Sequence, residues 1–139
     1  MGMSWVVYAL LSTLFFSGMI LLFKMILAQG IKPSILMLFI SICLTFFYFI
    51  HVALTRDSPK VNYWVLILLV VAGFLSYAGN LFYTKSIEIA PNPGYSAAII
   101  SLQLVIITLT SFFIFGSEIS FVKLTGIILA MVAGALLVW

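Results

Sequence analysis

The chain has 139 residues, of which 65% are hydrophobic and only 6% are charged. A soluble globular domain carries roughly 25% charged residues, so water could not solvate the surface of this chain. A soluble core of this length could not bury so much apolar surface, and lipid must therefore cover the remainder. The net charge of +3 is too small and too scattered for the basic stripe that nucleic-acid binding needs, so we expect no nucleic acid as a partner.

Five apolar runs divide the chain, and each is close to the length of about 20 residues that an α-helix needs to cross a bilayer. The runs cover residues 5–27, 34–54, 63–84, 95–115 and 121–138. Charged residues, glycine and proline gather between them, most clearly at residues 55–60 and 85–94. The runs lack the alternation of a membrane barrel. We therefore predict an all-α, polytopic membrane protein with five transmembrane helices, forming one membrane domain over residues 1–139.

The basic residues do not choose an orientation in the membrane. With five spans they divide evenly between the two sides, as Arg56, Lys60 and Lys123 against Lys24, Lys32 and Lys85. The positive-inside rule then has no difference to act on. Either one orientation is set by features that a charge count misses, or copies insert both ways and form an antiparallel dimer with the pseudo-two-fold arrangement of inverted-repeat transporters. Tags at each terminus, tested for accessibility from both sides, distinguish the two cases.

Groups that could build an enzyme active site are scarce. The sequence has no Gly-rich phosphate loop, no paired carboxylates and no nucleophile triad. Its single cysteine, Cys43, lies inside an apolar run without a second thiol for a disulfide or a metal. Its single histidine, His51, stands near the end of the second run, where it is either interfacial or able to couple proton movement. We expect no enzymatic activity, no metal and no cofactor.

Polar side chains inside hydrocarbon are costly unless they face other helices or a wet cavity, so helix faces on which they align are candidate linings of a substrate path. In the first run Thr13, Ser17 and Lys24 share such a face. The long stem of Lys24 also lets its ammonium group reach the interface with no role in transport. Both interpretations of Lys24 stay open.

The third run carries the polar face that we favour as a lining. Gly73, Tyr77, Asn80 and Thr84 align there at helical spacing. The amide of Asn80 both donates and accepts hydrogen bonds, which suits a polar ligand, but it could equally join two helices. Gln103, near the centre of the fourth run, presents the same choice, because an unpartnered amide there is costly.

The fifth run carries small residues at four-residue spacing, namely Gly126, Ala130 and Gly134. Small residues in this pattern let two helix backbones approach closely in a membrane. We interpret them as a packing surface, either against another helix of the chain or as a dimer seam.

The end of the chain resembles a known signature. Residues 116–120 read Gly-Ser-Glu-Ile-Ser and are followed by Gly126 and Gly134, which is similar to the closing signature of the EamA-type drug/metabolite transporter superfamily. The first run, from Trp5 to Lys24, and the Ala90-Pro91 step agree with that pattern. Members commonly contain two five-helix repeats in inverted orientation. The resemblance implies that this chain is one repeat, a half-transporter completed by a second copy or by a partner chain.

The related small multidrug resistance proteins are four-helix dimers in which a membrane-embedded glutamate of the first helix exchanges protons for cationic drugs. This chain departs from that pattern, because its first run has no acidic residue. Asp57, Glu88 and Glu118 all fall at predicted helix ends or loops. We do not expect proton-coupled export of cationic drugs through a buried carboxylate.

These features together predict a small secondary transporter or exporter of polar metabolites. It would work as a homodimer in the lipid bilayer, by alternating access to a site at the bilayer midplane. The alternative is a non-transporting membrane scaffold or assembly subunit, in which the polar faces only hold helices together. The substrate, the coupling ion and the host membrane stay open.

Overall fold

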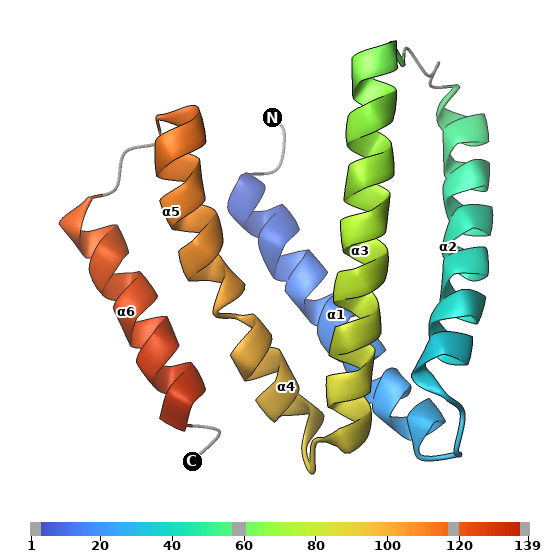
Figure 1. The fold of residues 1–139 in the computed structure, drawn as a ribbon, viewed down its shortest axis with the longest axis horizontal. Helices are drawn as coiled ribbons and strands as arrows, with labels where there is room; N and C mark the ends of the chain where they lie inside the picture. The colour runs from blue at the N-terminus through green and yellow to red at the C-terminus, as the bar shows by residue number, and fades with distance from the viewer. Residues whose placement is uncertain (1–3, 57–60, 117–119, 137–139) are drawn as a thin grey trace. The chain divides into compact units, whose positions relative to one another are not determined.

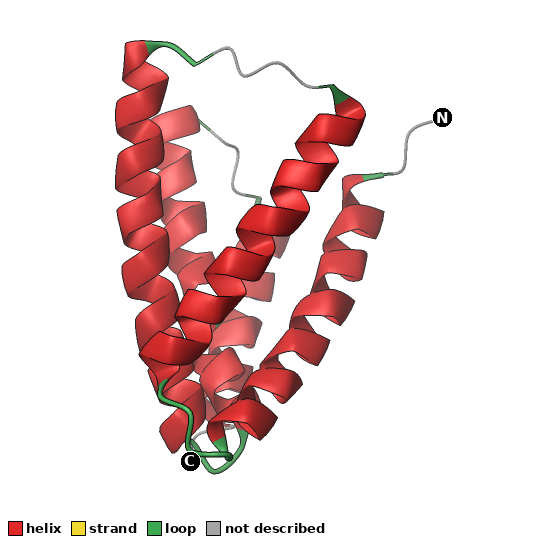
Figure 2. Cartoon of the chain, turned by 90° about the vertical axis from the view of Figure 1, so that its right-hand side faces the viewer, coloured by secondary structure: helices red, strands yellow, loops and turns green. Residues whose placement is uncertain are grey.

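The computed structural model describes residues 4–56, 61–116 and 120–136, without the side chain of Lys123. Every regular element in these ranges is an α-helix (Figure 2), which confirms the predicted fold class. The chain divides into two units, Met1–Glu88 and Ile89–Trp139.

The first unit contains three long helices (Figure 1): α1 (Trp5–Leu27), α2 (Pro33–Thr55) and α3 (Tyr63–Ile89). Side chains cap two of them, because the Ser4 hydroxyl accepts from the Val6 N–H and the Asn62 carboxamide accepts from the Val65 N–H. Gly30, with φ +82°, makes the turn between α1 and α2. Pro33 then occupies the first turn of α2, where its missing N–H costs no hydrogen bond.

The hydrophobic core of the first unit lies at one end of its helices. Its buried residues are Phe23 and Leu27 from the end of α1, Leu36 from the start of α2 and Ile87 from the end of α3. Half-buried residues packed against them come from the same parts of the helices, namely Met19, Ile20, Ile26, Met37, Ile40 and Tyr83. We call this region, formed by residues 19–40 and 83–88, the closed end, and the opposite ends of the three helices the open end.

Outside the closed end, large apolar side chains of the first unit are exposed. Phe15 on α1, Phe49 on α2 and Phe74 on α3 are 74%, 74% and 66% exposed. Contiguous apolar surface of this kind is not stable in water and requires lipid or another protein surface. The exposure pattern therefore agrees with the membrane location that composition indicates.

The second unit contains α4 (Pro93–Ile100), α5 (Gln103–Phe115) and α6 (Phe121–Leu136). The Asn92 side chain caps α4 by accepting from the Gly94 N–H, and Gly116, with φ +61°, ends α5. Helices α4 and α6 pack against each other through Gly134. A Cβ atom at Gly134 would lie 3.1 Å from the Ala98 carbonyl oxygen, so only glycine fits without a shift.

A local change of hydrogen bonding separates α4 from α5. The Ser101 hydroxyl donates to the Ala98 carbonyl at 2.6 Å, and that carbonyl is the one that a regular helix offers to the N–H of Leu102. The Leu102 N–H instead donates to Ile99, and the N–H groups of Leu104 and Val105 also reach back only three residues. The helix therefore tightens and breaks at Ser101 and Leu102 without proline or glycine.

Three predicted boundaries need correction. The third helix continues to Ile89 instead of ending at Thr84, because Lys85 and Glu88 are good helix formers and pair at i,i+3. The fourth run, predicted as one helix over 95–115, starts at Pro93 and is broken at Ser101. The second helix extends the predicted range by one residue at each end. The predicted end of the fifth helix at residue 138 lies outside the described residues.

In the described ranges, four helical stretches are long and apolar enough to cross a bilayer: Trp5–Leu27, Pro33–Thr55, Tyr63–Ile89 and Pro93–Phe115. The apolar part of α6, Leu124–Leu136, is shorter. The chain is thus an integral, multi-pass membrane protein.

We predict that Gly134→Leu lowers the free energy of unfolding by about 1–3 kcal/mol, because the new side chain collides with the Ala98 carbonyl. Gly18→Leu is the matched control inside another helix, α1, since a Cβ atom there meets nothing within 4 Å. Unfolding in mixed detergent micelles, followed by tryptophan fluorescence, measures both variants. Equal stability of the two variants would contradict the packing that we describe.

Candidate functional site

A polar ladder runs along the second half of α3. The Asn80 carboxamide donates through Nδ2 to the Ser76 carbonyl at 2.8 Å and to the Ser76 hydroxyl at 3.2 Å. One turn later, the Thr84 hydroxyl donates to the Asn80 carbonyl at 2.7 Å. These bonds lie within α3 and fix the rotamers of Asn80 and Thr84, so the amide of Asn80 is presented in a defined orientation.

The ladder lies on the side of α3 that turns into the core of the first unit. Thr84 and Ile87, four and seven residues after Asn80, are only 1% and 0% exposed. Residues at these spacings share a helix face. Asn80 and Tyr77 therefore continue the buried face of α3 toward the open end, where burial stops and both residues become exposed.

Tyr77 and Asn80 lie close to the middle of the span. The centre of α3 (Tyr63–Ile89) is Ser76, so Asn80 is about 6 Å from the centre along the helix axis. Within the described ranges nothing donates to the Asn80 Oδ1 atom, and the Tyr77 hydroxyl has no protein partner. The site thus offers an acceptor and a hydroxyl at the depth of the hydrocarbon core.

Gln103 offers a similar amide in the second unit. It is the first residue of α5, directly after the break, and is exposed. The span Pro93–Phe115 has Leu104 at its centre, so Gln103 also lies at mid-depth. Its side chain makes no hydrogen bond to any described residue.

The candidate residues on α1 are satisfied by their own helix. The Thr13 hydroxyl donates to the Ala9 carbonyl at 2.9 Å, and the Ser17 hydroxyl donates to the Thr13 carbonyl at 2.8 Å. A hydroxyl bonded in this way costs little when it faces lipid. Thr13 and Ser17 therefore need neither a substrate nor a neighbouring helix to explain their presence.

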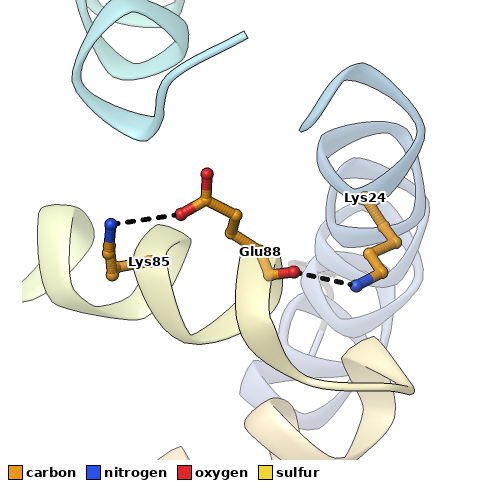
Figure 3. A network of polar contacts seen from close by, with 3 residues as sticks. All are labelled: Lys24, Lys85 and Glu88. Atoms are coloured by element: carbon orange, nitrogen blue, oxygen red, sulfur yellow. Dashed lines mark hydrogen bonds and ion pairs between the residues drawn. The ribbon is translucent and has the colours of Figure 1, made fainter. Parts of the chain in front are cut away.

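Lys24 connects α1 to α3. Its ammonium group donates to the Ile87 carbonyl at 3.0 Å and to the Glu88 carbonyl at 3.2 Å. Figure 3 shows the bond to Glu88. These carbonyls belong to the last turn of α3, where helix C=O groups lack intrahelical partners and the helix dipole is negative. The half-buried lysine thus contacts the C-terminal end of a neighbouring helix.

The Glu88 carboxylate pairs with Lys85 on its own helix, at 3.4 Å (Figure 3). The Lys85 side chain is 60% exposed, so the ion pair itself contributes little stability. Glu88 joins both contacts, through its carbonyl to Lys24 and through its carboxylate to Lys85. Asp57, Lys60 and Glu118 lie outside the described residues.

The small residues of α6 divide into two kinds. Gly134 is buried against α4, and Ala130 is half-buried. Gly126 is exposed, with no atom near its Cβ position. The Gly134 end of this surface therefore packs inside the second unit, and the Gly126 end is open to a further partner.

Two features of the site were missed in the sequence analysis. Ser101, which breaks the fourth span, looks like any isolated helical serine in sequence. The partners of Lys24 are backbone carbonyls. Every residue type has one, so the sequence does not show which carbonyls accept. Only the three-residue offset of Lys85 and Glu88 hinted that the helix continues far enough to meet Lys24.

The helical spans define the chain as a polytopic membrane protein. The sequence model of the EamA-like transporter family matches residues 3–139, and the chain belongs to this family, which confirms the resemblance noted from its closing signature. Comparisons with curated proteins and with solved structures found no match.

We predict that Lys24→Met lowers the free energy of unfolding by about 1–3 kcal/mol, because the last carbonyls of α3 lose a charged donor. Lys85→Met, which removes a lysine from the same end, should change it by less than about 1 kcal/mol. Unfolding in mixed micelles measures both. If Lys85→Met costs as much as Lys24→Met, the contact of Lys24 with α3 is not the source of the loss.

Proposed function

We propose that the protein is a small secondary transporter or exporter of polar metabolites that works as a homodimer by alternating access. The observation that carries this proposal is the polar face of α3, where Tyr77 and Asn80 lie exposed at mid-span with polar atoms that have no described protein partner. An amide or hydroxyl without a partner in an apolar medium costs roughly 2–7 kcal/mol. Water, a substrate or a second protein surface must therefore cover this face.

A second copy is the partner that we favour. The resemblance implies that residues 1–139 form one of two repeats, and transporter sites form between two such halves. The open end of the first unit and the Gly126 surface of α6 supply uncovered helix faces. The even division of basic residues allows the two copies to lie antiparallel.

The chemistry of the lining supports a polar substrate without a strong positive charge. Tyr77, Asn80 and Gln103 are neutral hydrogen-bonding groups. Among the described residues, the acidic side chain is that of Glu88, which lies at the end of α3 and pairs with Lys85. A carboxylate at mid-span, the group that would bind a cationic drug and exchange it for protons, is not found in the described spans.

Transport by the reconstituted protein tests the proposal. In liposomes, we expect uptake of one or more members of a polar metabolite panel, and we expect Asn80→Leu and Gln103→Leu to abolish it while folding stays intact. Ser17→Ala and Thr13→Val are the matched controls and should retain transport, because both hydroxyls are bonded within α1. Inertness toward a broad panel would favour the alternative, a membrane scaffold.

Water access to α3 gives a test that needs no substrate. In a Cys43→Ala background, which has no other cysteine, we expect a thiol at Asn80→Cys to react with a charged, water-soluble reagent much faster than one at Phe82→Cys. Thiolate forms only where water reaches the sulfur. Phe82 is the matched control, since it is 74% exposed at nearly the same depth but on the opposite face of α3. Equal reactivity would contradict a wet path along Asn80.

A further inference from the structure

Among the described residues, the core of the first unit lies at one end of its helices, and Lys24 lies at that end. All ten residues of its core cluster come from residues 19–27 of α1, 36–40 of α2 and 83–87 of α3. Lys24 is one residue from the buried Phe23 and donates to two carbonyls of α3. Toward the open end, residues 5–18 of α1 and residues 41–55 of α2 are exposed.

The polar side chains nearer the open end form bonds within their own helices. Thr13 and Ser17 on α1, Ser41 and Thr45 on α2 and Asn80 on α3 each donate to a residue four positions earlier. These bonds satisfy each helix separately and do not connect one helix to another. The described contacts that join α1 to α3 are therefore concentrated at Lys24 and the adjoining core.

The environment of the Lys24 ammonium group differs from that of a snorkelling lysine. A snorkelling side chain extends into water at the interface, and its ammonium group is solvated there. Lys24 is half-buried. Its ammonium group donates hydrogen bonds to two carbonyls at the C-terminal end of α3, at 3.0 and 3.2 Å. Such a bond is charge-assisted and directional, and it fixes the distance between two helices at one level.

We propose that Lys24 is a positioning residue that fastens the end of α1 to the end of α3, so that the closed end acts as a pivot. Movement of α1 relative to α3 then changes the spacing of the two helices at the open end and leaves it unchanged at the closed end. This inference concerns the first unit alone and does not depend on the identity of the substrate. It assigns to Lys24 a mechanical role in place of contact with the transported molecule.

Distances between spin labels in lipid nanodiscs test the pivot. In the Cys43→Ala background, one label pair replaces Met25 and Phe82 near the closed end, and a second pair replaces Leu10 and Leu69 toward the open end; all four side chains are exposed. Labelled protein is diluted with excess unlabelled protein, so that distances between copies do not contribute. We expect a narrow distance distribution for the first pair and a broad or multiple one for the second.

Variants of Lys24 then connect the narrow distribution to the ammonium group. Lys24→Met should roughly double the width at the closed end, since fewer contacts define the preferred state. Lys24→Arg keeps a charged donor, and Lys85→Met removes a lysine whose described ion pair lies within α3. Both should leave the width unchanged. The pivot is overturned if the two pairs are equally broad in the parent protein, or if Lys24→Met keeps the closed end narrow. The comparison in the parent protein decides the question even if Lys24→Met does not fold.

Discussion

Hydrocarbon offers no hydrogen bonds, and this constraint explains most of what the chain does with its polar groups. Backbone groups form hydrogen bonds within helices, and most hydroxyls donate to a carbonyl of their own helix, as those of Ser17 and Thr45 do. The Lys24 ammonium group donates a hydrogen bond to a carbonyl at the end of α3. Against this background, the amides of Asn80 and Gln103 at mid-span keep polar atoms without a described partner, and polar groups of this kind in a membrane interior are candidates for function.

Sequence alone predicted much of this fold, because the bilayer imposes a minimum helix length that apolar runs reveal directly. The class, the approximate spans and the family all followed from that pattern and from the closing signature. Boundaries were less predictable. The third helix ends five residues later than predicted, because Lys85 and Glu88 pair at i,i+3 and allow the helix to continue.

The candidate site was only partly predictable, for a physical reason. Periodicity places Tyr77, Asn80 and Thr84 on one face, but it does not show that Thr84 is buried while Asn80 is exposed. It also cannot separate a hydroxyl that bonds its own backbone, such as Thr13, from one that needs an outside partner. The break at Ser101 depends on which group donates a hydrogen bond to the Ala98 carbonyl. The sequence alone does not show which group donates.

The central claim is that the mid-span face of α3 is wetted within the bilayer. Solid-state NMR of the protein in lipid, with only asparagine labelled with ¹⁵N, measures transfer of magnetisation from water to three side-chain amides, those of Asn62, Asn80 and Asn92. Asn62 and Asn92 lie at helix ends and serve as wet references. We predict transfer to Asn80 at a rate comparable to theirs. An Asn80 amide that stays dry while both references receive magnetisation would contradict the account.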